Sequence, residues 1–440
     1  MVNSAIERLA AMPRFVSTIC LRRVSAVLEN EGIVCPPSIA ITGSKGKGSV
    51  AAMTDALLRS IGLRTVRHTS PHFISPSERI ALNGDPINDA QFEDLLQRVL
   101  DATTTVSRRY QETFARFEIL FLAAVLLSQD ERVDCAILEG GIGGRLDPTS
   151  VVGAKLFGLT SVELEHTDLL GRTVDQIACD KLDIGGTHST AILGAIDPTL
   201  VDRVSYYASR RDIKMVRATD RFCLYDYAED VNGARARVRA RASSGDRSVR
   251  LPLFGQYQLN NAAVALALAE HFTEPDIGPD VDWIGVAGTA WNGLSVPGRL
   301  ETIRTNPTIV VDAAHTPDSV KGVVSTLLRW RQERRVLLVG VSEDKDWQGI
   351  ADILVQLAAS IIVSRSGPRG LNPDQLANAF RDCGGNVVSV TEDLPKALEL
   401  AIDEAKRGGA TLYVIGSLYF SADVVRLLTG SSPADAIIIG

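Results

Sequence analysis

The sequence predicts an α/β protein of two domains, each built on a mainly parallel sheet, with a small antiparallel sheet appended to the first domain. Short apolar runs that favour strands alternate with helical patterns along most of the 440 residues, which is typical of parallel sheets covered by helices on both faces. A glycine-rich turn at residues 43–49 joins one such strand to a helix. Asn232-Gly233 joins two alternating runs and indicates a hairpin.

Length, composition and charge exclude several classes of protein. A chain of 440 residues that is 45% hydrophobic and 22% charged has room for two or three domains with full cores. The net charge of −7 argues against a nucleic-acid surface. The longest apolar run, Ile119–Leu127, is too short to span a bilayer, so no membrane partner is expected.

The cysteines and the N-terminal residues indicate the cellular compartment. Six cysteines are scattered without a CxxC pair, which fits reduced thiols better than disulfides or zinc, and Cys135 is expected in the core. Residues 1–10 lack the apolar core of a signal peptide. We therefore expect a cytoplasmic protein, and a monomer because no long exposed heptad pattern or repeat is present.

The glycine-rich turn has the composition of a phosphate-binding loop. Two helical patterns in residues 4–32 precede a strand from Ile39, and the turn after it consists of Gly43, Ser44, Lys45, Gly46, Lys47, Gly48 and Ser49. Backbone N–H groups and the helix N-terminus can converge on an anion there, and Lys47 can pair with phosphate oxygens. The spacing differs from the standard loop, and a plain Gly/Ser turn is the alternative, although two lysines would repel each other without an anion. The first domain is therefore predicted to be P-loop ATPase-like.

The next strands bring candidate metal ligands towards this loop. After the strand Thr65–Thr69, the two prolines of Ser70–Arg79 predict a loop that passes the phosphate site. Helices at 90–106 and 114–127 lead to the buried strand Asp134–Glu139. Glu139 at the carboxyl end of this strand is where an α/β nucleotide enzyme places a magnesium ligand, although it could instead be a solvated charge.

The remainder of the first domain carries a histidine, a lysine and the small sheet. The strand Phe157–Val162 ends near His166, which could be structural but lies where open sheets bind ligands, and the helix Val174–Leu182 carries Lys181. One more strand and helix precede the antiparallel segments. Residues 234–241 alternate arginine with small residues, and we interpret them as an edge strand with a solvated face rather than a binding patch. Residues 257–271 return to helix.

A hinge is predicted at residues 293–299, which gives domains of 1–296 and 297–440. The second domain is predicted to be a smaller Rossmann-like α/β domain with five strands, at 308–311, 335–339, 361–363, 387–390 and 411–415. Polar groups at the ends of these strands are expected to face the first domain. They are Asp312, His315, Asp344, Lys345, Asp346 and Ser417.

Together these motifs resemble the folylpolyglutamate synthase and dihydrofolate synthase family, within the Mur ligase superfamily of ATP-dependent amide-bond ligases. The resemblance covers nearly the whole chain. The matching segments, in order, are Thr42–Ser49, Thr69–His72, Glu78–Ile80, Asn83-Gly84, Phe117-Glu118, Glu139, Gly143–Asp147, Glu165–Gly171, Lys181, Gln258, Asn261-Ala262, Pro297–Glu301, Asp312, Ala314-His315, Asp344–Asp346 and Gly416–Tyr419.

The resemblance implies roles for individual residues. It assigns the ATP phosphates to the loop and further nucleotide contacts to Asn261, Arg299 and Asp312. Ser70, Glu139 and His166 are the implied magnesium ligands. Lys181 matches a lysine that is carbamylated in such enzymes and can then bind a second magnesium ion. It places the incoming amino acid at His315 and Ser417, and the carboxylate substrate beside His72, Arg79, Arg145 and Asp147. Lys47, Lys181 and His315 are then the expected catalytic residues.

The chemistry implied is activation of a carboxylate by ATP. The acid is converted to an acyl phosphate, and an amine then attacks through a tetrahedral intermediate while closure of the two domains excludes water. Small-molecule carboxylate and amino-acid substrates, ATP and Mg²⁺ are the expected ligands, with glutamate and a folate or dihydropteroate as the best match.

Several positions depart from the family pattern, mostly on the substrate side. They are Phe121, Pro148, Ser150, Leu182, Tyr257, Ala313 and Thr316. A related ligase that joins a different carboxylate and amine is therefore an open alternative. A P-loop kinase for small molecules, suggested by the loop alone, and a catalytically silent nucleotide-binding homologue, suggested by the changes around His315, are two others.

Overall fold

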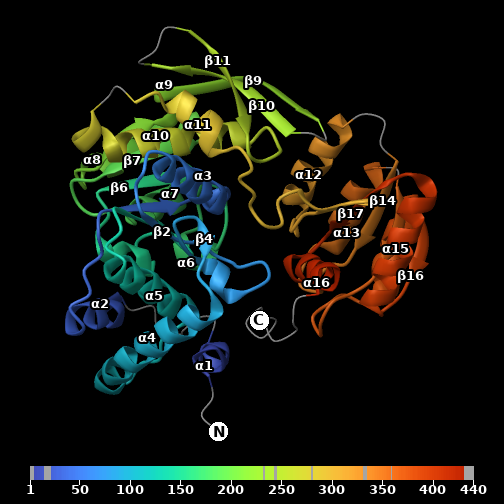
Figure 1. Cartoon of the computed structure of the whole chain (residues 1–440), viewed down its shortest axis with the longest axis horizontal. Coiled ribbons are helices and arrows are strands. Elements are labelled where there is room, and N and C mark those ends of the chain that lie inside the picture. Colours follow the sequence, from blue (N-terminus) through green and yellow to red (C-terminus); the bar gives the residue numbers. More distant parts are fainter. Residues whose placement is uncertain are drawn as a thin grey trace.

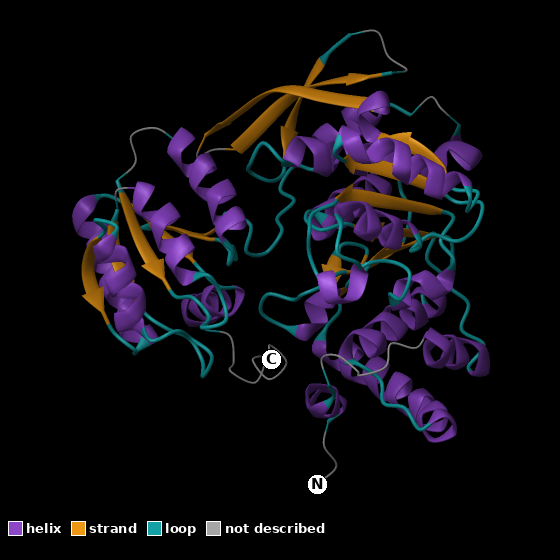
Figure 2. Ribbon diagram, turned by 180° about the vertical axis from the view of Figure 1, so that it is seen from behind, coloured by secondary structure: helices purple, strands orange, loops and turns teal. Residues whose placement is uncertain are grey.

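The computed structural model describes residues 4–13, 21–230, 233–241, 245–278, 281–330, 334–357 and 359–430. It contains two α/β domains, with a small antiparallel sheet above them that reaches from the first domain towards α12 of the second (Figure 1). The view from behind shows helices packed around the strands of both domains (Figure 2). The predicted fold class is confirmed. In the described part of the chain, no helix is both long and apolar enough to cross a membrane.

The first domain is organised around β1, which lies inside an eight-stranded sheet of order β4-β3-β2-β5-β1-β6-β7-β8. Its strands are β1 (Ser38–Thr42), β2 (Thr65–His68), β3 (Ile80–Leu82), β4 (Asp85–Pro86), β5 (Cys135–Glu139), β6 (Leu156–Ser161), β7 (Thr190–Ala195) and β8 (Lys214–Arg217). β1 pairs in parallel with β5 and β6, and Ile41 lies opposite Glu139. The register therefore brings Glu139 to the edge of the sheet where the glycine-rich loop begins.

Helices cover both faces of this sheet, as the apolar strands predicted. They are α1 (Ala5–Ala11), α2 (Leu21–Asn30), α3 (Lys47–Ser60), α4 (Asp89–Tyr110), α5 (Arg116–Asp130), α6 (Thr167–Leu170), α7 (Val174–Leu182), α8 (Pro198–Ser209), α9 (Ala218–Arg221), α10 (Gln258–Ile277) and α11 (Trp283–Ala290). Ile39 and Ile41 of β1 face the cluster formed by α3, α10 and α11, while Ala40 faces the cluster of α7 and α8. Successive strand residues point to opposite faces, so β1 is buried on both sides.

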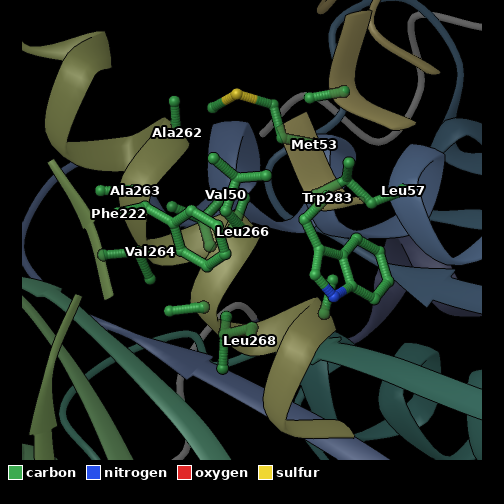
Figure 3. Packing of buried hydrophobic residues seen from close by; sticks show 14 of the residues in the cluster. Val50, Met53, Leu57, Phe222, Ala262, Ala263, Val264, Leu266, Leu268 and Trp283 are labelled. Carbon is green, nitrogen blue, oxygen red and sulfur yellow. The ribbon is translucent and has the colours of Figure 1, made fainter. Parts of the chain in front are cut away.

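The helix that follows the glycine-rich loop is held by close packing. Val50, Met53 and Leu57 of α3 lie against the alanine-rich helix α10 and Trp283 of α11 (Figure 3). All the side chains of this contact are buried, and each fully buried aliphatic or aromatic side chain contributes roughly 1.5–3 kcal/mol by leaving water. Helix α11 was not predicted from the sequence, because it has only eight residues and its two glycines weaken the helical pattern.

The small antiparallel sheet has the order β11-β10-β9, with β9 (Phe222–Asp230), β10 (Gly233–Ala240) and β11 (Arg247–Leu251). The prediction that the arginine-rich segment is an edge strand is wrong, since β10 is the middle strand. Its solvated face is confirmed, because Arg235, Arg237 and Arg239 are exposed while the alternate residues are buried. Asp230 pairs with Gly233 as a hairpin requires, whereas Asn232 lies outside the described residues.

The second domain has a six-stranded sheet of order β12-β13-β17-β14-β15-β16. Its strands are β12 (Glu301–Thr305), β13 (Thr308–Val311), β14 (Arg335–Val339), β15 (Ser360–Val363), β16 (Asn386–Val390) and β17 (Thr411–Ile415), and its helices of eight or more residues are α12 (Pro317–Arg329), α13 (Trp347–Leu354), α14 (Pro373–Asp382), α15 (Leu394–Gly408) and α16 (Leu418–Thr429). The five predicted strands are present and parallel. The sixth, β12, was missed because its exposed, polar residues form an antiparallel edge without an apolar run.

One contact between the domains joins the small sheet to helix α12. The rings of Phe254 and Trp330 meet edge to face with centroids 4.9 Å apart. Arg329 donates to Glu229 Oε1 at 2.9 Å, and Glu229 Oε2 accepts from the Gly255 N–H at 3.0 Å. The Glu229 side chain is 0% exposed, so Arg329 is the cation that compensates a buried carboxylate.

We expect Arg329→Ala to destabilise the protein by roughly 1–3 kcal/mol, because it leaves the buried Glu229 carboxylate without its cation. Arg365→Ala is the matched control, since its partner Glu392 is 61% exposed and such pairs contribute about 0–1 kcal/mol. Urea unfolding followed by tryptophan fluorescence measures both variants. Equal shifts of the unfolding midpoint in the two variants would show that the Arg329–Glu229 pair stabilises the protein no more than an exposed ion pair does.

Candidate functional site

The glycine-rich loop begins where β1 ends, and helix α3 starts at Lys47. Gly43 and Gly46 have φ values of 142° and 86°, in the range that glycine tolerates best. A Cβ atom on Gly43 would overlap Thr160 Oγ1, and one on Gly46 would overlap the Asn261 side-chain amide. The loop therefore requires glycine for its backbone conformation and for its close contact with β6 and α10. The first N–H groups of α3 have no acceptor within the helix, so they can bind an anion.

The two lysines of the loop have different environments. Lys47 Nζ donates to the Gly43 carbonyl at 2.8 Å, which keeps the ammonium folded over the loop. Lys45 Nζ lies 2.8 Å from Glu163 Oε2, and its side chain is 49% exposed. Lys47 is therefore the lysine placed to meet a phosphate, while Lys45 already has an anionic partner. The assignment of both to ATP stays a prediction.

Glu139 lies beside the start of α3. Its side chain is buried, its Oε2 accepts the Ser70 N–H at 2.9 Å, and a Cβ atom on Gly48 would come within 3.5 Å of that oxygen. Burial raises the pKa of Glu139, and Lys47 is the largest of the charges that oppose this shift. The structure thus brings together the predicted metal ligands Ser70 and Glu139 with the phosphate loop.

Lys181 is buried on helix α7 and forms an ion pair with Glu165, with Nζ 2.8 Å from Oε1. Burial lowers the pKa of the Lys181 ammonium, and the hydrogen bond to Glu165 opposes the shift. Burial alone would raise the pKa of Glu165, but Lys181, Ser44 and Lys47 together hold it below its usual value. Glu165 therefore links Lys181 to the loop. No individual role was predicted for Glu165, because its pairing with Lys181 depends on the packing of α7.

His166 occupies a different kind of position. It precedes the short helix α6 with φ 45° and is exposed. Within the described ranges, no group of three or more His, Cys, Asp or Glu side chains is arranged to hold a metal. The predicted ligand set also includes a serine and a lysine, and it stays a prediction. The carboxylate of Glu139 and the hydroxyl of Ser70 are hard oxygen donors of the kind Mg²⁺ prefers, so these two residues fit the ion.

The predicted carboxylate-binding residues fall into two groups. Arg79 Nε donates to His72 Nδ1 at 2.8 Å. His72 is buried and its Nε2 has no hydrogen-bond partner, while burial and the nearby arginines, Arg79 first, lower its pKa to about 3. This neutral imidazole with a free nitrogen in cationic surroundings suits an anionic or polar ligand.

Asp147 and Arg145 belong to the glycine-rich turn after β5. Asp147 is buried and accepts the N–H groups of Gly141 at 2.7 Å and Ile142 at 3.0 Å. Its carboxylate therefore stabilises the turn that follows Glu139. Arg145 is 57% exposed and lies 3.3 Å from Asp180. A direct contact of either residue with substrate stays a prediction.

The second domain contributes Asp312 at the end of β13. Its carboxylate is buried and accepts the N–H groups of Leu300 at 2.9 Å and Ala314 at 2.8 Å. Burial raises the pKa of Asp312, and Arg299 is the largest opposing influence. On the first domain, Asn261 donates to Gln258 at 2.8 Å and its amide lies against Gly46 of the loop.

The predicted amino-acid site lies at the ends of β13 and β17. The His315 ring nitrogen Nδ1 is 2.9 Å from the Ala313 carbonyl, and this contact fixes the orientation of the ring. Ser417 Oγ is 3.3 Å from Ser342 Oγ, and Lys345 pairs with Asp344 at 2.8 Å. Asp346 caps helix α13, because its Oδ1 accepts the Gly349 N–H at 3.0 Å.

Comparison with known proteins finds two family domains in this chain. Residues 41–269 match the Mur ligase middle domain, and residues 298–418 match the Mur ligase glutamate ligase domain. The chain is 32% identical to the dihydrofolate synthase/folylpolyglutamate synthase of Mycobacterium tuberculosis over 93% of this chain and 87% of that protein.

Two further comparisons cover most of the chain. It is 34% identical, over 88% of its length, to a probable bifunctional folylpolyglutamate synthase/dihydropteroate synthase of Halobacterium salinarum, and spans 46% of that longer protein. The structure of M. tuberculosis folylpolyglutamate synthase complexed with ADP superposes with a TM-score of 0.83 and 32% identity, covering 96% of both chains.

The site also predicts a pH dependence of stability through His68, which is fully buried against the rings of Phe117 and Phe121. Burial, with a contribution from Arg79, lowers its pKa to about 3. Below the unfolded pKa of about 6.5 the unfolded chain binds a proton that the folded chain does not, so stability falls as pH decreases.

We expect protonation linked to His68 to lower the free energy of unfolding by about 2 kcal/mol when the pH falls from 7 to 5. This part of the pH dependence should be absent in His68→Leu. His188→Leu is the control, because the His188 side chain is 75% exposed. Urea titrations at both pH values measure the difference. A pH dependence that is unchanged in His68→Leu would contradict this account.

Proposed function

The chain belongs to the folylpolyglutamate synthase and dihydrofolate synthase family of the Mur ligase superfamily, and from this we propose that it joins glutamate to the carboxylate of a folate or dihydropteroate at the expense of ATP. Members of this family are ATP-dependent ligases, and this chain is one of them. The observation that carries the proposal is the assembly of Lys47, Ser70 and Glu139 at the start of α3, beside the Lys181–Glu165 pair.

The first step is transfer of the γ-phosphoryl group. A carboxylate oxygen of the substrate attacks the γ-phosphorus of ATP, the bond to the bridging oxygen breaks, and ADP leaves with that electron pair. The N–H groups at the start of α3 and the ammonium of Lys47 stabilise the charge on the phosphate oxygens. Mg²⁺ held by Ser70 and Glu139 would neutralise further phosphate charge when bound.

The second step is amide formation. The amine of the incoming glutamate attacks the carbonyl carbon of the acyl phosphate, and inorganic phosphate leaves from the tetrahedral intermediate. In this proposal His315 and Ser417 of the second domain bind the glutamate. Arg299 and Asp312 of the second domain and Asn261 of the first bind the nucleotide. The two substrates would therefore be held by different domains, and approach of these domains shields the acyl phosphate from water.

The environment of Lys181 supports its carbamylation. Burial lowers the pKa of its ammonium and increases the fraction of neutral amine, the form that adds CO₂. In that reaction the nitrogen forms a bond to carbon and releases a proton, and the product carries a negative charge. A carbamate on Lys181 would add a second anionic group next to Glu165, and these oxygen donors would hold a second divalent cation that neutralises their charge.

The decisive experiment identifies the product. Purified protein with ATP and Mg²⁺ is supplied with dihydropteroate, tetrahydrofolate or other carboxylates, each with the twenty amino acids, and the products are weighed. We expect ADP, phosphate and a glutamyl amide in equal amounts. A stable phosphorylated substrate would indicate a kinase, an amide with another pair would indicate a different ligase, and no turnover would overturn the proposal.

Lys47→Ala tests the site within this assay. We expect kcat to fall by at least about 100-fold, as on loss of a charge-stabilising group, while the protein stays folded. Lys45→Ala is the matched control, because it removes a lysine from the same loop whose ammonium already pairs with Glu163. A Lys47→Ala enzyme as active as Lys45→Ala would show that the loop does not bind the reacting phosphate.

Carbamylation of Lys181 predicts a spectroscopic signal. In protein equilibrated with ¹³C-bicarbonate we expect a carbamate ¹³C resonance that is lost in Lys181→Met. Lys155→Met is the control, since Lys155 is an exposed lysine that donates to the Thr187 carbonyl. A resonance that persists in Lys181→Met would assign the modification elsewhere, and the absence of any resonance would contradict it.

A further inference from the structure

The loop from Ser70 to Arg79 belongs to the first domain in sequence, but one of its side chains lies in the core of the second. Phe73 is 4% exposed and belongs to the buried cluster that includes Val311 at the end of β13, Ala313 just after it and Phe420 of α16. A Cβ atom on Gly298 would come within 2.8 Å of the Phe73 ring. The ring therefore fills a socket that begins at the segment joining the two domains.

A second contact holds the same loop to helix α16. Arg426 Nη2 donates to the Ile74 carbonyl at 2.7 Å, and Nη1 lies 2.6 Å from Asp423 Oδ1. The Arg426 side chain is 7% exposed, so this hydrogen bond is shielded from water. A buried, charge-assisted bond to a backbone carbonyl fixes the position of the loop more firmly than an exposed one.

The loop itself is stiff. The Glu78 carboxylate accepts the N–H groups of Phe73 at 2.8 Å, Ile74 at 2.8 Å and Ser75 at 2.7 Å. Thr69 N–H donates to the Arg79 carbonyl at 3.0 Å, which closes the base of the loop. A displacement of Phe73 is therefore transmitted to the base of the loop instead of being absorbed within it.

The base of the loop lies at the phosphate site. Ser70, three residues before Phe73, donates its N–H to Glu139 Oε2 at 2.9 Å, and Glu139 lies beside Gly48. Phe73 thus connects the core of the second domain to the carboxylate at the start of α3 through a short, hydrogen-bonded segment.

We propose that Phe73 is a positioning residue that couples the placement of the second domain to the Ser70–Glu139 pair, so that acyl phosphate forms only when the amine-binding domain is in place. The inference rests on the proposed function. Without this coupling, the γ-phosphoryl group is still transferred to the carboxylate, but water instead of the amine attacks the carbonyl carbon. Phosphate then leaves, the free acid is regenerated, and ATP has been consumed without an amide.

The experiment compares ADP and amide formed by the full-length protein with saturating ATP, carboxylate and glutamate. We expect the wild-type protein to give equal amounts. Phe73→Ala should give more ADP than amide, by up to about a hundredfold, since a misplacement of about 1 Å can change a rate by that factor. Phe73→Leu, which refills most of the socket, should restore much of the ratio. Arg426→Met, which removes the donor to Ile74, should uncouple in the same direction.

Leu398→Ala is the matched control. Leu398 is buried in the same cluster but lies on α15, so its loss weakens the core of the second domain and leaves the Phe73 side chain and the Arg426 donor in the protein. We expect this variant to keep equal ADP and amide, even if both rates fall. Equal ratios in Phe73→Ala and Arg426→Met, or uncoupling in Leu398→Ala, would overturn the inference. Failure of the wild-type protein to form any amide would instead overturn the proposed function.

Discussion

The site depends on one constraint, the parallel pairing of β1 with β5. Both strands run in the same direction, so their carboxyl ends meet at one edge of the sheet, and the pairing of Ile41 with Glu139 sets which residues meet there. Glu139 thereby lies next to the first turn of α3, although almost a hundred residues separate the two in sequence. A shift of one residue would turn Glu139 to the other face of the sheet and remove it from the loop.

Charge in this buried region is balanced locally. The positive charge of Lys47 acts on two carboxylates, because it lowers the pKa values of Glu139 and Glu165, and it also lowers the pKa of Lys181. Isolated charges are costly to bury, and this alternation of signs reduces the cost while leaving the groups close enough to act on a phosphate. Burial shifts the pKa values of Glu139 and Lys181 towards their neutral forms, while Lys47 opposes the shift of Glu139 and Glu165 opposes that of Lys181. Shifted pKa values of this kind are common where binding and catalysis occur.

Two contacts of different chemistry join the domains. The small antiparallel sheet contacts α12 through the Phe254–Trp330 ring pair and the Arg329–Glu229 ion pair, whereas the Ser70–Arg79 loop contacts α16 through Phe73 and Arg426. The second contact leads through the Ser70 N–H to Glu139 beside the glycine-rich loop. A ligand that binds across the domains would therefore act directly on the second contact.

The sequence by itself determined the features that depend on local pattern. The alternation of strands and helices, the glycine-rich loop, the hairpin and the solvated arginine face of β10 each follow from residue periodicity or from backbone conformations within a few positions. Tertiary structure alone decided the rest. The middle position of β10, the polar edge strand β12, the Lys181–Glu165 pair and the burial of Phe73 in the second domain depend on which distant segments pack together, and short-range pattern does not encode those contacts. For this reason the sequence indicated the loop and its lysine, while their partners emerged only from the fold.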